Sequence, residues 1–139
     1  MPYRVFFDTN VLVYAHDTGS RKKKARSQEL IFKAIRNRTG VVSPQVLSEF
    51  FVTVTQKVAR PMDAECARRE IILLATMATV DLDATLVVRA IDMKREHQLN
   101  YWGALILAAA ERAECPVVYS EDLSHDQSYG GVTVQNPYI

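Results

Sequence analysis

Acidic side chains follow the predicted strands of this chain at several separate points. Asp8 comes directly after the first strand, and Glu121 and Asp122 follow the strand at 117–120. Glu49 lies about a turn and a half into the helix after the second strand. Carboxylates gathered at one edge repel one another unless a cation lies among them, and oxygen ligands favour Mg²⁺ or Mn²⁺ over zinc. The pattern indicates a divalent-metal site equipped for phosphodiester hydrolysis, where the metal activates water and neutralises phosphate charge.

Each of these residues also has a purely structural interpretation. Asp8 could cap the first helix, Glu49 alone is typical of a solvated helix face, and an acidic pair such as Glu121-Asp122 is common in turns. Asn10 could cap the same helix or hold a metal-bound water, and capping is the favoured interpretation of that residue by itself. The prediction of a metal site therefore depends on the joint placement of the acids.

Gly103 is the unexpected residue near this edge. It falls in the first turn of a helix predicted over 100–113, with Asn100 as a good N-cap. Glycine in a helix costs up to about 1 kcal/mol relative to alanine, whereas an acid at that place would favour the positive end of the helix dipole. Helix formation alone therefore does not explain the glycine.

Short apolar strands alternate with helical segments along the whole chain. Strands are predicted at 3–7, 41–42, 116–120 and 132–134. Helices are predicted at 11–16, between Gly19 and Gly40, after the caps Ser43, Asp63 and Asp83, and at 100–113. This alternation predicts an α/β fold with a mostly parallel sheet, which binds ligands beyond the carboxyl ends of its strands.

Composition limits the class of protein. The 139 residues contain no repeat and no linker, so we expect one domain over 1–139. The net charge of +1 gives no indication of a nucleic-acid or a membrane partner. The N-terminus has no signal-peptide pattern, and no apolar run approaches the ~18 residues of a membrane span. Cys66 and Cys115 lack ligand spacing and fit reduced thiols, so we expect a cytoplasmic protein without a membrane partner.

Two further groups of residues could contact a nucleic acid. One is the basic run that opens the second predicted helix, which is typical of a solvated face but could also contact RNA phosphates: Arg21, Lys22, Lys23, Lys24 and Arg26. The other is the aromatic pair Tyr101-Trp102, for which we expect packing at the helix entry rather than base stacking. The histidines are scattered and give weak support to a histidine-based site.

Four motifs in this order resemble the PIN domain, and within it the VapC-type toxins of bacterial toxin–antitoxin pairs. They span nearly the whole chain: FFDTNVLVYA at 6–15, VVSPQVLSEFFVT at 41–53, YWGALILAAA at 101–110 and YSEDLSHDQSYGGVTVQNPY at 119–138. Each motif alone is a weak signal, but the ordered set is specific. The resemblance implies a three-layer α/β/α sandwich with a central, mostly parallel sheet.

The resemblance also implies an activity and a set of site residues. Such proteins are Mg²⁺- or Mn²⁺-dependent endoribonucleases, whose catalytic and metal-binding acids fall here on Asp8, Glu49 and Asp122, with Asn10 and Glu121 as polar support. Their third acid comes in a YWDALI-like motif, where this chain has Gly103. A cognate antitoxin, an RNA substrate and a homodimer are the implied partners. Gly103 then marks a lost metal ligand, natural or engineered, that weakens or abolishes activity.

Other classes fit less well. A catalytically silent PIN-like module that binds RNA or protein is favoured by Gly103, but it has no evident need for the retained acids. A haloacid-dehalogenase-like phosphatase would want a second aspartate where this chain has Asn10. A dinucleotide-binding protein would have a glycine-rich turn after the first strand, and none is present.

Overall fold

A central sheet with the strand order β3-β2-β1-β4-β6-β5 organises the computed structural model, which describes residues 3–17 and 19–139. Every neighbouring pair is parallel except β5 and β6, so the predicted mostly parallel sheet is confirmed. The strands are β1 (Val5–Phe7), β2 (Gly40–Val42), β3 (Ala78–Thr79), β4 (Val117–Tyr119), β5 (Ser128–Tyr129) and β6 (Val132–Gln135).

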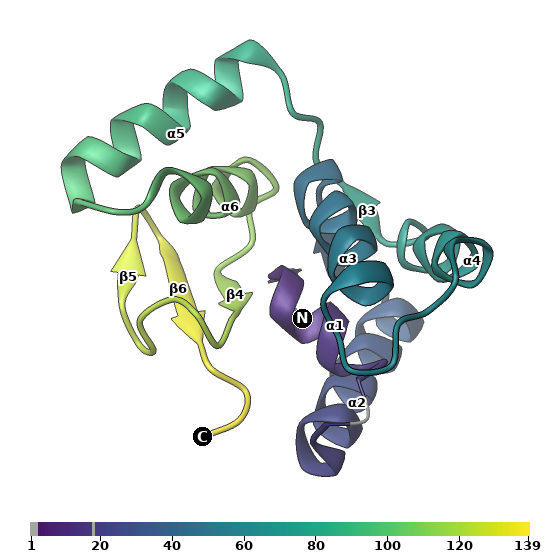
Figure 1. The fold of residues 1–139 in the computed structure, drawn as a ribbon. Coiled ribbons are helices and arrows are strands. Elements are labelled where there is room, and N and C mark those ends of the chain that lie inside the picture. The colour runs from purple at the N-terminus through teal and green to yellow at the C-terminus, as the bar shows by residue number, and fades with distance from the viewer. Residues whose placement is uncertain (1–2, 18) are drawn as a thin grey trace.

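Helices cover the sheet on both sides and complete a three-layer α/β/α sandwich. In Figure 1, α1 to α4 gather on one side of the view, while α5 and α6 lie over β4 to β6 on the other. The helices are α1 (Thr9–Tyr14), α2 (Arg21–Asn37), α3 (Pro44–Gln56), α4 (Ala64–Leu74), α5 (Ala84–His97) and α6 (Tyr101–Arg112). The fold class expected from the sequence is confirmed.

The helix starts follow the capping residues seen in the sequence. Ser43, Asp63, Asp83 and Asn100 each accept a hydrogen bond from a backbone N–H in the first turn of α3, α4, α5 and α6. The first helix begins two residues earlier than predicted, because Asp8 is its N-cap and accepts from the backbone N–H of Thr9. These caps fix the points at which the chain turns from strand or loop into helix.

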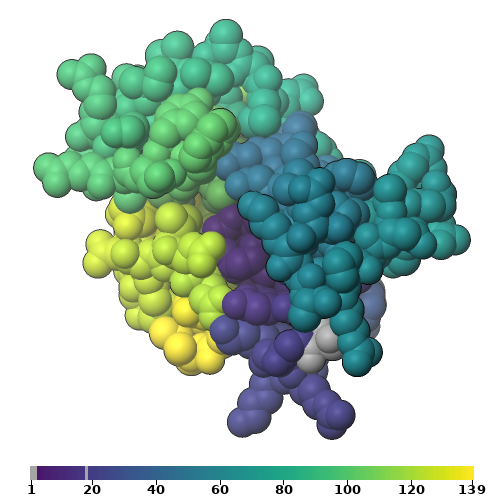
Figure 2. Space-filling view, in the orientation of Figure 1, coloured from purple at the N-terminus to yellow at the C-terminus, as the bar shows by residue number. Residues whose placement is uncertain are grey.

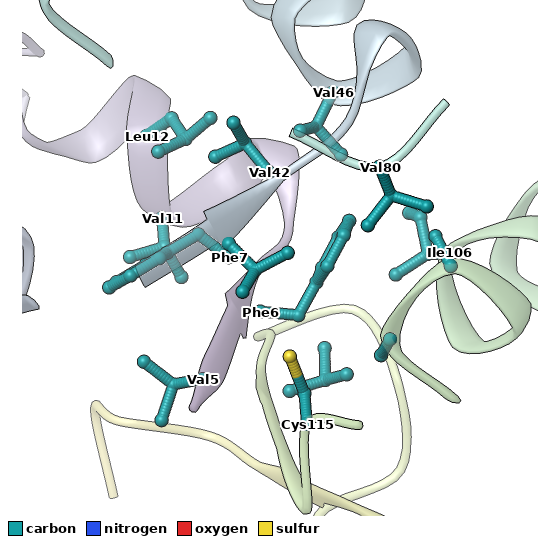
Figure 3. Close-up of a cluster of buried hydrophobic side chains, with 14 of the residues drawn as sticks. Val5, Phe6, Phe7, Val11, Leu12, Val42, Val46, Val80, Ile106 and Cys115 are labelled. Carbon is teal, nitrogen blue, oxygen red and sulfur yellow. The ribbon is translucent and has the colours of Figure 1, made fainter. Parts of the chain in front are cut away.

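The central strand β1 is enclosed by the hydrophobic core. All three residues of β1 are buried, and Phe6 and Phe7 are fully so. Figure 3 shows these side chains among Val42 and Val46 from β2 and α3, with the Cys115 thiol close below. Burial raises the pKa of Cys115 to about 12, and Cys66 is half-buried; both thiols are free. A strand this deeply buried leaves little freedom to the residue that follows it, Asp8.

Two short strands were missing from the prediction. β3 consists of Ala78 and Thr79, which are both exposed, so no apolar run marks it. β5 pairs antiparallel with β6 through a turn at Gly130 and Gly131, whose φ angles are +57° and +86°. Such angles suit glycine in a tight hairpin. Within the described part of the chain, no helix has the length and apolar character needed to cross a membrane.

Candidate active site

The parallel register of β1 and β4 brings the first and last parts of the site together. Phe7 pairs with Tyr119, so the next residues, Asp8 and Ser120, face each other across the sheet edge. The Ser120 hydroxyl donates to Asp8 Oδ2 at 2.7 Å and accepts the backbone N–H of Asp122 at 3.1 Å. This fully buried serine therefore ties Asp8 to the loop that carries Asp122.

Asn10 joins the two aspartates directly. Its Nδ2 donates to Asp8 Oδ2 at 3.3 Å and to Asp122 Oδ2 at 3.2 Å, and its Oδ1 accepts the Glu121 backbone N–H at 3.1 Å. The expectation that Asn10 caps the helix is wrong, because Asp8 occupies the N-cap position and Asn10 lies inside α1. One amide thus holds two carboxylates that the sequence separates widely.

Glu49 reaches the same region from α3. Its Oε1 accepts a hydrogen bond from the Thr9 hydroxyl at 3.1 Å, and its side chain is exposed. Asp8, Glu49, Asp122 and Gly103 all line one cleft of about 930 Å³. In Figure 2 the purple surface of the N-terminal residues lies between the teal surface of α3 and the yellow-green surface of the later chain. The cleft is therefore formed where α1, α3, α6 and the loop after β4 meet.

The lining of the cleft carries more negative than positive charge. Among its described lining residues, Asp8, Asp17, Glu49 and Asp122 are opposed by the single cation Lys57. The pKa of Asp8 is raised to about 6, chiefly by burial; hydrogen bonds from Ser120 and Thr9 oppose the rise, and the charges of Asp122 and Glu49 add to it. Ionised Asp8 is thus poorly solvated and close to like charges, a situation that a bound cation relieves.

Glu121 is outside the described lining of the cleft. Its carboxylate binds the Lys23 ammonium of α2 and accepts the Tyr14 hydroxyl of α1. Partial burial raises the pKa of Glu121, but the hydrogen bonds from Lys23 and Tyr14 lower it further, so the pKa is depressed overall. Lys23 also lies 4.7 Å from the Tyr14 ring centroid. Glu121 thus fastens the loop before Asp122 to two helices.

The basic run divides into engaged and outward residues. Lys23 is paired with Glu121, and Arg26 contacts Glu29 and the Pro137 carbonyl. None of the run belongs to the described lining of the cleft, and its remaining members lie on the first half of α2: Arg21, Lys22 and Lys24. Their contact with RNA stays a prediction.

Gly103 leaves room for a side chain in the cleft. A Cβ built there would meet Leu123 Cδ2 at 3.1 Å, which is close but involves the end of a flexible side chain. A Cβ at this position would therefore need only a small shift of Leu123. Over residues 3–17 and 19–139, no three acidic, histidine or cysteine side chains stand close enough to hold one ion as they are arranged.

Sequence patterns did not indicate three residues of the site. Ser120 could have been found from strand register, because it follows β4 as Asp8 follows β1. Thr9, which holds Glu49, carried no distinguishing signal. Gln45 lies in the first turn of α3 and is only 7% exposed; its Nε2 donates to the Trp102 carbonyl at 3.2 Å, while its Oε1 is buried without a partner among the described residues.

The aromatic pair at the start of α6 differs from the expectation. Tyr101 is half-buried, but Trp102 is 59% exposed and lines the cleft. The expected packing of Trp102 at the helix entry is therefore wrong for most of its indole. Its ring meets the Tyr101 ring edge-on, with centroids 5.2 Å apart and an interplanar angle of 73°.

The chain is similar to the PIN domain in sequence and to several solved structures in fold. The model of the PIN domain matches residues 5–129. No curated protein matches the chain. A toxin–antitoxin complex from Klebsiella pneumoniae contains a chain with 20% identity and a TM-score of 0.68, with 96% of this chain and 98% of that one covered.

Two further solved structures share the fold. VapC20 from Mycobacterium tuberculosis, described as a sarcin-ricin loop cleaving toxin, has 15% identity and a TM-score of 0.62 over 85% of this chain and 89% of that one. VapBC2 from Rickettsia felis, solved with a DNA fragment of its promoter, has 16% identity and a TM-score of 0.68 over 94% and 96%. At these identities the likeness is one of fold.

Proposed function

Because this chain belongs to the PIN domain family, we propose that it is a VapC-like endoribonuclease toxin whose activity Gly103 has weakened or abolished. The observation that carries the proposal is the meeting of Asp8 and Asp122 at one amide inside an acidic cleft. A structural cap or a loop turn would not require carboxylates from separate segments to converge. An RNA phosphate, itself anionic, would be repelled by this cleft without a cation.

Asp8, Asp122 and Glu49 would hold Mg²⁺ or Mn²⁺, for which carboxylate oxygens are suitable ligands. The donor set fits a hard cation, since burial and neighbouring carboxylates already strain ionised Asp8. A divalent ion there supplies activation of the attacking water and neutralisation of phosphate charge. The third acid of the family motif is missing here, because the first turn of α6 has Gly103 in its place and carries no carboxylate.

The chain's own polar residues orient the acids. Asn10 donates from its Nδ2 to the carboxylates of both Asp8 and Asp122, and Ser120 fixes the backbone of Asp122. Thr9 draws the exposed Glu49 side chain toward α1. Such supporting contacts commonly change metal affinity or activity by tenfold or more. Lys57, the cation among the described lining residues, would meet the phosphate of an RNA that enters the cleft.

Restoring the acid tests this proposal. Gly103→Asp should give Mg²⁺- or Mn²⁺-dependent cleavage of total RNA well above the unaltered chain, and Gly103→Ala serves as the matched control. Asp8→Ala in the Gly103→Asp background should abolish the gain. A Gly103→Asp protein that is folded, binds Mn²⁺ and cuts no RNA would overturn the enzyme assignment. Sequencing the cleavage ends would identify the RNA target.

A second candidate is a PIN-like module that binds RNA or protein without catalysis. Gly103 is the specific observation that favours it, because the first turn of α6 brings no carboxylate into the cleft. Titration with Mn²⁺ separates the two candidates. A module should bind RNA with the same affinity in the presence and absence of metal, and Gly103→Asp should leave it unable to cut.

The partners follow from the same assignment. The similar structures include toxin–antitoxin complexes, and we propose that a cognate antitoxin covers this cleft with a basic side chain among the acids. A homodimer acting in the cytoplasm completes the proposal. Light scattering of the purified chain tests the dimer, and loss of RNA cleavage by Gly103→Asp on adding the antitoxin tests the covering segment.

A further inference from the structure

We propose that Trp102 is a stacking platform for an unpaired nucleobase next to the scissile phosphate, with Gln45 as the residue that positions it. This inference rests on the proposed function and names the class of RNA that the site accepts. Trp102 is 59% exposed and shares one cleft with Asp8, Glu49 and Asp122. A large apolar ring left in water beside a polar site is the kind of surface on which bases stack.

The backbone of Trp102 is held from both sides. Its N–H donates to Asn100 Oδ1 at 2.9 Å, and its carbonyl accepts from Gln45 Nε2 at 3.2 Å. The Tyr101 ring supports the indole through an edge contact, which leaves much of the indole surface accessible. A ring with a fixed base and an open surface loses little conformational entropy on binding, which suits a recognition surface.

Gln45 adds an independent observation. Gln45 lines the cleft, and only 7% of its surface is exposed. Its Oε1 is buried and has no hydrogen-bond partner within residues 3–17 and 19–139. A buried acceptor without a partner lowers stability, and an apolar residue of similar size would avoid that cost. Among the described residues, the hydrogen bond of its side chain goes to the Trp102 carbonyl. The amide therefore serves the position of the start of α6 rather than the packing of the core.

The class of substrate follows from geometry. Bases inside a duplex already stack on their neighbours, so a protein ring reaches them only in single strands, loops or bulges. Stacking is tolerant of sequence because every base has a π-face. Trp102 thus selects for unpaired nucleotides, while the acids act on the adjoining phosphate.

Intrinsic fluorescence gives a direct test, because Trp102 is the only tryptophan in the chain. The unaltered protein, whose Gly103 suppresses cleavage under the proposal, is titrated with fluorescein-labelled single-stranded oligouridylate and oligoadenylate in Mg²⁺. Anisotropy of the label measures RNA binding, and tryptophan emission from parallel titrations with unlabelled RNA reports contact at Trp102. We expect the emission to be quenched along the same binding curve as the anisotropy.

Variants separate stacking from other effects. Trp102→Leu should weaken the RNA Kd by about five- to a hundredfold, and Trp102→Phe should weaken it less, as expected for loss of one stacked base. RNA of the same length with abasic nucleotides should bind the unaltered and Trp102→Leu proteins equally. Phe32→Leu removes an aromatic ring of nearly equal exposure, 58%, that lies on α2 outside the cleft lining, and should change nothing.

Gln45→Leu tests the positioning residue. It should keep or raise stability in urea, monitored by circular dichroism, and yet weaken RNA binding severalfold and reduce the emission change. In the Gly103→Asp background, both Trp102→Leu and Gln45→Leu should raise KM more than they lower kcat.

Two results would overturn the inference, and they differ from each other. If RNA binds by anisotropy but neither emission nor the Trp102→Leu Kd changes, the ring serves another partner, such as a protein segment, and the proposed nuclease stands. If no RNA binds to the unaltered chain and none is cut by Gly103→Asp, both the stacking platform and the proposed function fail.

Discussion

At the scale of single residues, Asp8 combines two roles that the sequence presented as alternatives. It caps α1 through the Thr9 N–H, and it also meets Asn10 and Ser120 at the centre of the cleft. Capping therefore does not argue against a site, because the cap fixes the carboxylate where the chemistry needs it. The arrangement has a cost in stability, because the ionisable Asp8 side chain is buried with only 5% of the residue exposed.

That cost predicts a pH dependence of stability. The pKa of Asp8 rises from 3.8 to about 6 on folding, chiefly through burial. Between about pH 4 and 6 the folded protein keeps a proton that the unfolded chain has lost, so stability falls as the pH rises, by up to about 3 kcal/mol. Urea unfolding in EDTA should show that the difference between the unaltered protein and Asp8→Asn changes over this window. A difference that is constant with pH would contradict the assignment.

Substitution of Gly103 is expected to raise the stability of the metal-free protein. Gly103→Ala should stabilise the metal-free protein by about 0.5–1 kcal/mol, because alanine favours the helix and Leu123 can move away from the new Cβ. Gly103→Asp should gain less, since the benefit from the helix dipole is opposed by repulsion from Asp8 and Asp122. Urea unfolding of the three proteins checks the order. Destabilisation by alanine would show that Leu123 cannot yield.

At the scale of elements, strand ends explain what the sequence could predict. Asp8 and Asp122 were placed correctly near one rim because β1 and β4 are apolar and parallel. Ser120 and Gln45 were missed because a serine and a glutamine carry no charge and fit many loops and helices. β3 and β5 were missed because a strand of two residues cannot show a period. The contact of Glu121 was missed because its partner, Lys23, lies on a helix far away in the sequence.

The start of β2 depends on a glycine for close packing. A Cβ on Gly40 would lie 2.2 Å from the sulfur of buried Met77 and 3.1 Å from the Ala34 Cβ of α2. Gly40→Ala should therefore destabilise the protein by about 1–3 kcal/mol, the usual cost of overpacking. Thermal or urea unfolding measures this change. Gly19→Ala is the control and should be nearly neutral, because the nearest atoms to its new Cβ belong to Asp17 and lie at ordinary contact distance.

At the scale of the whole molecule, the α/β architecture was predictable because caps and apolar strands agree along most of the chain. That the segments carrying Asp8, Glu49, Gly103 and Asp122 share one rim was predictable from the strand ends as well, whereas the full strand order was not. The candidate site therefore lies on a rim to which segments far apart in the sequence contribute. Any ligand that joins those segments should stabilise the whole chain.

Metal binding should show this coupling. A metal that binds only the folded state at about a hundred times its Kd adds about 2.7 kcal/mol of stability. Titration with Mn²⁺ should raise the Tm of the unaltered protein, and Gly103→Asp should reach the same shift at a lower concentration, by tenfold or more. Asp8→Ala should show little shift. An equal response of all three proteins would place the metal elsewhere.

The buried thiol beside the central strand has a practical consequence. Cys115 is 2% exposed just before β4, whereas Cys66 is half-buried on α4. A thiol-alkylating reagent should therefore modify Cys66 in the native protein and reach Cys115 only when the sheet itself opens. Mass spectrometry of the two cysteine peptides would then time the rare openings of the core without any engineered probe.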